Sequence, residues 1–266
     1  MDTDSVDKND KTNFNNSKSN LEKIKNKYIL SQIFDNLSKF VLLEIIRYNK
    51  NIQSKLDIKL NDFKEYYELY SPIVIEIIPV PNKSGKFINI SDDYKSYYHI
   101  YFDNNTEETD STSLEEEDNI SKIKIFIDYK IKSLNKLFDN CICIESIIFK
   151  RFTRYNIEDM RAMFWECNSL KEINLTKFNT TNVTNMSWMF FNCSSLKEVN
   201  ISNFRVDNLE KMVGMFWGCK SLEEVKLPIF NDDNQIEMKS MFTECSDELK
   251  NKIKAQNNKI GDEAFQ

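Results

Sequence analysis

The sequence predicts an α/β repeat solenoid of 26-residue units, each a short strand plus a short helix, behind an α+β N-terminal cap. Three observations predict this fold. Five cysteines stand 26 residues apart, apolar columns repeat around them in the same register, and the spacing of apolar residues changes within each unit. A fixed period of this length is typical of one supersecondary unit that is copied and stacked. The cysteines are Cys141, Cys167, Cys193, Cys219 and Cys245.

The strand of each unit is predicted from alternation, and the helix is predicted from a longer spacing. Residues 173–175 alternate apolar and polar side chains, as a strand with one buried face does. Met186, Met189 and Phe190 have the i, i+3, i+4 spacing of a short helix. One unit buries too few side chains to offset the entropy of ordering its backbone, so we expect the units of 121–245 to be stable only together.

The cysteine column is predicted to point inward and to fill the core with small thiols. Neighbouring strands lie about 5 Å apart, which would allow bridges, but a reducing compartment argues against disulfides. Cys143 lies outside the column, and no further Cys or His pair at zinc spacing accompanies it and Cys141. We therefore expect no metal site, and no motif for a cofactor is present in the sequence.

The rest of the chain divides by composition. Residues 1–20 have almost no apolar content, which predicts a disordered tail. Residues 21–58 keep helical spacing, residues 59–103 are expected to form a small β cap that covers the open edge of the solenoid, and residues 104–119 are an acidic loop. Residues 246–266 are predicted to form a C-terminal helical cap over the last repeat.

The residues from Val183 to Phe204 carry a resemblance to a known family. They match the run V-T-N-M-S-x-M-F-x-x-C-x-S-L-x-x-L-x-L-S-x-F almost throughout, and the match recurs in phase over 121–245. This stretch resembles the BspA-like leucine-rich repeat family. The resemblance implies a leucine-rich-repeat-like solenoid of a kind found largely in surface and adhesion proteins of bacteria and protists, so a surface adhesin is one candidate function.

A second resemblance lies in residues 28–57. The stretch ILSQIFDNLSKFVLLEIIRYNKNIQSKL is similar to an F-box, although the usual Leu-Pro opening and the Trp near the end are absent. The resemblance implies a substrate adaptor of a ubiquitin ligase that holds a Skp-type partner through this stretch, and the alternative is a helical cap. The matching residues are Ile29, Leu30, Ile33, Phe34, Leu37, Leu42 and Leu43.

Composition argues against several classes of function. The net charge is −6 with mixed signs, and no basic face points to a nucleic-acid partner. No apolar stretch approaches the roughly 18 residues of a membrane span, and the first residues lack a signal-peptide pattern, so we expect no membrane insertion and a cytoplasmic location. The BspA-like resemblance makes the cell surface the alternative. One histidine, His99, and no catalytic motif argue against an enzyme.

The predicted partner-binding surface consists of outward columns of the repeats. The strand columns are polar or charged, and an aromatic column just after the inward phenylalanines flanks them. Aromatic side chains dominate interface energies, so we predict a non-enzymatic module that presents a rigid repeat surface to a protein partner. The alternative is that the rings pack between turns. The predicted site residues are Glu172, Asn174, Glu198, Asn200, Glu224, Lys226, Trp165, Phe191 and Trp217.

Overall fold

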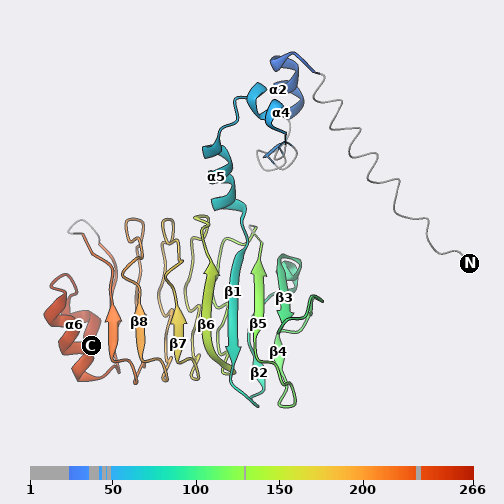
Figure 1. Ribbon diagram of the computed structural model, residues 1–266. Helices are drawn as coiled ribbons and strands as arrows, with labels where there is room; N and C mark the ends of the chain where they lie inside the picture. Colours follow the sequence, from blue (N-terminus) through green and yellow to red (C-terminus); the bar gives the residue numbers. More distant parts are fainter. Residues whose placement is uncertain (1–23, 36–41, 44–45, 47–48, 129, 232–234) are drawn as a thin grey trace, which may run out of the picture. The chain divides into compact units, whose positions relative to one another are not determined.

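The computed structural model describes residues 24–35, 42–43, 46, 49–128, 130–231 and 235–266 (Figure 1). The predicted tail of residues 1–20 and part of the helical segment 21–58 lie outside the described residues. The chain divides into two compact units, Met1–Tyr70 and Ser71–Gln266, which we call the N-terminal unit and the repeat unit.

The described part of the N-terminal unit is helical. Its helices are α2 (Lys27–Asp35), α4 (Lys50–Lys55) and α5 (Leu60–Tyr70). The side chain of Asn49 caps α4 by accepting a hydrogen bond from the Ile52 amide at 3.1 Å. Helix α5 occupies the start of a range, 59–103, in which the sequence favoured strands. The buried apolar cluster of this unit is Leu30, Phe34, Leu43, Ile46 and Ile52.

A five-stranded mixed sheet, in the order β3-β5-β1-β6-β7, begins the repeat unit (Figure 1). Strand β1 alternates buried residues on the core side, and it pairs antiparallel with both β5 and β6. Strands β6 and β7 are parallel, as are β8 and β9. The strands are β1 (Ile73–Pro79), β2 (Gly85–Lys86), β3 (Tyr98–Phe102), β4 (Ser113–Leu114), β5 (Ile123–Ile127), β6 (Ile144–Arg151), β7 (Glu172–Asn174), β8 (Glu198–Asn200) and β9 (Glu224–Lys226). The helical elements are η1 (Asp92–Tyr97), α6 (Asp247–Gln256) and η2 (Asp262–Phe265).

Successive repeats lie side by side, with equivalent residues in parallel register. Asn185 bridges to Asp159 on one side and to Lys211 on the other, each 26 residues away. In every unit, a segment such as residues 186–193, here called the turn segment, donates alternate amides to the next unit. In that segment the amides of Met186, Trp188, Phe190 and Asn192 donate to the carbonyls of Lys211, Val213, Met215 and Trp217 at 2.8, 2.8, 2.9 and 2.6 Å.

The predicted α/β repeat solenoid is wrong. The structure is a mixed, sheet-rich fold with few helices, and no repeat contains the expected short helix. The turn segment has hydrogen bonds from residue i to i−3, and two of its residues are left-handed, such as Trp188 (φ 62°) and Asn192 (φ 56°). A right-handed helix cannot contain such residues, although consecutive turns produce the same i, i+3, i+4 apolar spacing.

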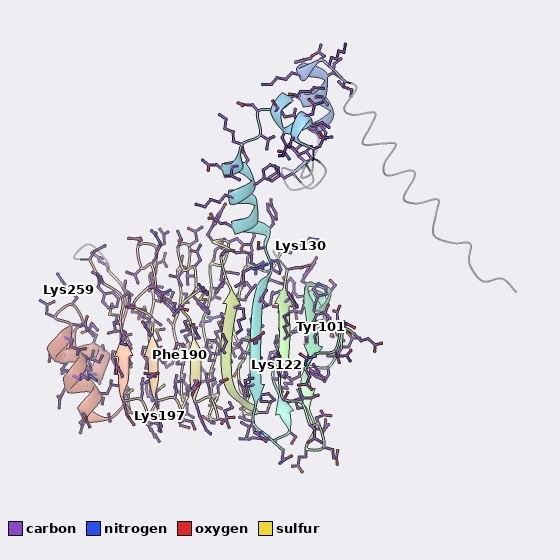
Figure 2. All side chains as sticks on the ribbon, viewed as in Figure 1. Tyr101, Lys122, Lys130, Phe190, Lys197 and Lys259 are labelled. Atoms are coloured by element: carbon purple, nitrogen blue, oxygen red, sulfur yellow. The ribbon has the colours of Figure 1, made fainter. Side chains whose placement is uncertain are left out.

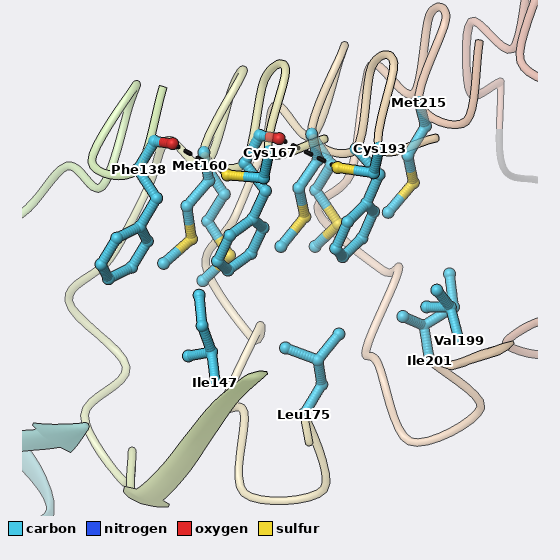
Figure 3. Close-up of a cluster of buried hydrophobic side chains, with 14 of the residues drawn as sticks. Phe138, Ile147, Met160, Cys167, Leu175, Cys193, Val199, Ile201 and Met215 are labelled. Atoms are coloured by element: carbon cyan, nitrogen blue, oxygen red, sulfur yellow. Dashed lines mark hydrogen bonds between the residues drawn. The ribbon is translucent and has the colours of Figure 1, made fainter. Parts of the chain in front are cut away.

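The predicted N-terminal α+β cap is not a separate layer either. Strands β1, β3 and β5 join β6 in one sheet, so the part of the chain before the repeats shares the core of the repeats. That core lies between the turn segments and the strands (Figure 3). Phenylalanines of successive turn segments form a stacked row, with ring centroids 5.2 Å apart for Phe164 and Phe190 and 5.5 Å apart for Phe190 and Phe216.

Candidate functional site

The strands β7, β8 and β9 place six of the nine predicted site residues on one outward surface, which we call the strand face. Each strand turns its middle residue toward the core and its two outer residues away from it, because successive side chains of a strand alternate. Parallel pairing then sets Glu198 opposite Glu224 and Asn200 opposite Lys226. The strand face consists of Glu172, Asn174, Glu198, Asn200, Glu224 and Lys226.

The strand face is hollowed by three adjoining grooves. The largest, of about 810 Å³, extends from β7 to the start of α6. Two smaller grooves, of about 220 and 140 Å³, lie over β6–β8 and over β7–β9. All three grooves include Glu198, so they form one continuous surface.

Positive charges alternate with these carboxylates. Lys171 and Lys197 precede β7 and β8 and line the largest groove, and Figure 2 shows Lys197 at the edge where the strands begin. Lys171 Nζ lies 2.7 Å from Glu145 Oε1, and this hydrogen bond raises the pKa of Lys171. Lys226 Nζ lies 3.5 Å from Glu224 Oε1 on the same strand. The strand face therefore presents both signs of charge at fixed spacing.

Asn174 and Asn200 also have a local structural role. The Oδ1 atom of Asn174 accepts hydrogen bonds from the Thr176 amide at 3.0 Å and from its hydroxyl at 2.7 Å. Asn200 accepts the same pair from Ser202, at 3.1 and 2.7 Å. Such side-chain bonds stabilise a turn directly after a strand. These two asparagines shape the end of the strand face while their side chains stay exposed.

The three aromatic residues of the predicted site are half-buried and contact one another. The rings of Trp165 and Phe191 stack with centroids 3.9 Å apart, and Phe191 lies 6.1 Å from Trp217. Trp188, which the sequence analysis did not include, completes this aromatic cluster with centroids 5.7–5.8 Å from all three. The signal for Trp188 was its column, where Ala162 and Gly214 are small enough to leave room for an indole.

The structure separates the aromatic cluster from the strand face. The aromatic rings belong to turn segments, whereas the charged residues belong to strands, and the buried core lies between the two (Figure 3). Trp165 and Trp217 each adjoin an inward phenylalanine of a turn segment and project on that side of the core. The sequence analysis treated the aromatic row as flanking the polar ladder, and the fold instead gives the repeat unit two distinct surfaces.

The cysteine column has no features of a reactive site. The thiols of Cys167, Cys193 and Cys219 each donate to the carbonyl of the phenylalanine 29 residues earlier, at 3.0 Å. Burial raises the pKa of Cys193 and Cys219 well above the usual value, and it raises the pKa of Cys143 to about 11. All six thiols are buried and unbridged. A reactive cysteine needs a lowered pKa and access to solvent, so this column belongs to the core.

The remaining candidate groups do not form a catalytic constellation. His99 lies on β3 with Nδ1 3.0 Å from Glu108 Oε1 and Nε2 3.7 Å from Asp128 Oδ2. Among the described residues, no three His, Cys, Asp or Glu side chains gather where they could hold a metal ion. Within the same described ranges, no helix has both the length and the apolar character needed to cross a membrane.

Comparison with known proteins gives one family match. A family model described as "Mycoplasma protein of unknown function, DUF285" matches residues 132–256, from the first turn segment to the end of α6. No curated protein and no solved structure matched the chain. The match covers less than half of the sequence, and its description names no activity.

Proposed function

We propose that the repeat unit is a non-enzymatic protein-binding module and that the strand face is its binding surface. The observation that carries this proposal is the continuity of the three grooves, which share Glu198 and include all six residues of the strand face. Protein partners bind to exposed surfaces that combine shape with charge complementarity. The BspA-like resemblance of residues 121–245 supports the same class of function.

The backbone behind the strand face favours this role. Val199 and Val225 anchor β8 and β9 in the core, and hydrogen bonds between units fix the spacing of the outward carboxylates. A surface that is already ordered loses little conformational entropy on binding. Because the groups on the strand face are charged and exposed, we expect the association rate to fall as salt concentration rises.

A charge-reversal experiment tests the strand face. The double variant Glu198→Lys, Glu224→Lys changes two of its carboxylates, and the control Glu210→Lys, Glu237→Lys makes the same change at two exposed residues outside it. Proteins captured from cells by the wild-type chain are purified and titrated against each variant. We expect the strand-face variant to bind at least about tenfold more weakly and the control to bind like the wild type.

Equal binding by all three chains would assign recognition to another surface. In that case Trp165→Ser, Trp217→Ser tests the aromatic cluster, with a thermal transition measured first because both rings are half-buried.

A ubiquitin-ligase adaptor remains the second candidate, favoured by one observation. Leu30, Phe34 and Leu43, which carry the F-box resemblance, belong to the apolar cluster of a compact unit distinct from the repeats. Capture experiments with the full chain and with residues 71–266 test this role. Recovery of a cullin-type ligase with the full chain alone would support the adaptor, and its absence from both would exclude it.

The proposed location is the cytoplasm, and the adhesin implied by the BspA-like resemblance would instead lie at the cell surface. Fractionation of cells that express the tagged chain separates the two. A signal at the cell surface would contradict the cytoplasmic proposal.

A further inference from the structure

The last repeat ends in a surface that the chain covers with its own C-terminal residues. In the preceding turn segment, Gly214 and Phe216 donate their amides to the carbonyls of Lys239 and Met241, at 3.0 and 2.9 Å. The equivalent donors of the last unit, Ser240 and Phe242, have no further repeat to bond. The surface they form with Thr243 and Lys254 is here called the end face.

Residues 261–266, here called the C-terminal segment, occupy the end face as a substitute for the missing repeat. Ser240 and Phe242 donate to the carbonyls of Glu263 and Ala264, both at 2.7 Å. The hydroxyl of Thr243 donates to the Gln266 carbonyl. The donors that would otherwise remain open at the edge of the stack are thus satisfied by carbonyls of one short stretch of chain.

The C-terminal segment also continues the row of phenylalanines. Phe265 stacks on Phe242 with centroids 5.5 Å apart and an angle of 16° between the rings, and Phe242 stacks on Phe216 at 5.5 Å and 14°. Phe265 lies only 23 residues after Phe242, so the segment reproduces the contact without the 26-residue spacing of a repeat.

Helix α6 holds the segment from the side. Lys254 Nζ lies 2.9 Å from Asp262 Oδ1 and 4.7 Å from the centre of the Phe265 ring. The connection from α6 to the segment is short, because α6 ends at Gln256 and η2 begins at Asp262. The end face therefore recognises three features of the segment: two carbonyls, an aromatic ring and a carboxylate.

We propose that the end face is a self-association surface, on which the C-terminal segment of a second copy of this chain takes the place of the chain's own segment. Each contact joins the segment to the body of the repeat unit, so the same contacts form whichever copy supplies it. The covalent connection gives the chain's own segment a high effective concentration, which keeps the end face closed in the monomer. Exchange becomes favourable when the connection can no longer reach back.

The first test supplies the segment in trans. A chain that lacks residues 261–266 is titrated with a fluorescent peptide of residues 257–266, and anisotropy measures binding. We expect saturable binding, and a peptide with Phe265→Ala should bind at least about tenfold more weakly because it loses the stacked ring. A folded truncated chain that binds neither peptide, or both equally, overturns the proposal.

The second test keeps every contact residue and decides the question if the truncated chain does not fold. Deletion of Asn257 and Asn258 shortens the connection after α6, and deletion of the exposed residues Glu116 and Glu117 is the matched control. Light scattering after size-exclusion chromatography should find a dimer for the first variant and a monomer for the control. A shortened chain that remains monomeric, or that no longer folds, contradicts the proposal, because exchange would restore all of the contacts.

Discussion

At the scale of single residues, the turn segments depend on a few left-handed positions. Trp188 and Gly214 occupy equivalent left-handed places in successive units, with φ of 62° and 57°. A Cβ atom at Gly214 would lie 2.4 Å from the Trp188 ring. Glycine at position 214 therefore serves both the backbone conformation and the space that the indole needs.

Gly214→Ala should lower the free energy of unfolding by about 2–4 kcal/mol, from left-handed strain plus the overlap with Trp188. The same change in a Trp188→Ala background should cost only about 1–2 kcal/mol, because only the strain remains. Urea denaturation of the four chains of this double-mutant cycle measures the coupling. Equal costs in both backgrounds would show that the ring does not restrict position 214.

At the scale of elements, the sequence predicts the strands better than the turn segments. Alternation at 173–175 corresponds to the observed strand β7 and its neighbours, because a strand is the regular structure whose side chains have a period of two. The spacing of Met186, Met189 and Phe190 predicted a helix, but two left-handed residues in each unit prevent one. Trp188 and Glu166 have no strong left-handed preference, so composition gave no sign of this conformation.

The buried thiols of the turn segments should make stability depend on alkaline pH. Burial raises the pKa of Cys193 well above 9.0, so this thiol contributes fully to stability below pH 9. Above that pH the unfolded chain loses the proton while the folded chain keeps it, and stability falls as pH rises. Each such thiol contributes a slope of up to about 1.4 kcal/mol per pH unit.

Cys193→Ser tests this dependence, because a serine hydroxyl can replace the donor to the Phe164 carbonyl and does not titrate in this range. Denaturant unfolding at pH 7, 8, 9 and 10 should give a shallower alkaline decline for the variant than for the wild type. The difference between the two chains should be constant from pH 7 to 8, which is the internal control. Parallel curves up to pH 10 would contradict the buried-thiol account.

At the scale of the whole molecule, the 26-residue period predicts which residues become neighbours but not how the array is completed. Residues 123–127 lie on the same apolar columns as later units, yet they form strand β5, which runs antiparallel to β1. Long-range pairing of this kind leaves no local pattern in a sequence. The same limit applies to the candidate site, since the columns of Glu198 and Trp165 were predictable whereas their separation by the core followed only from the fold.

The repeat unit should fold without the N-terminal unit. Its apolar core extends from Ile73 to Phe265, and the cluster around Leu30 is separate from it. A chain of residues 71–266 should therefore keep a cooperative thermal transition within about 5 °C of the corresponding transition of the full chain, since domains with their own cores fold independently. Near-ultraviolet circular dichroism, which is sensitive to the packed aromatic rows, measures both.

The matched control is a chain of residues 98–266, which lacks β1. Because β1 pairs with both β5 and β6, its removal opens the middle of the sheet and exposes two strand edges. We expect this chain to lose the cooperative transition and to aggregate, whereas residues 71–266 remain monomeric. If both chains folded equally well, the turn segments and β6–β9 would be self-sufficient and the antiparallel strands dispensable. If neither folded, the N-terminal unit would contribute stability that its separate apolar cluster does not account for.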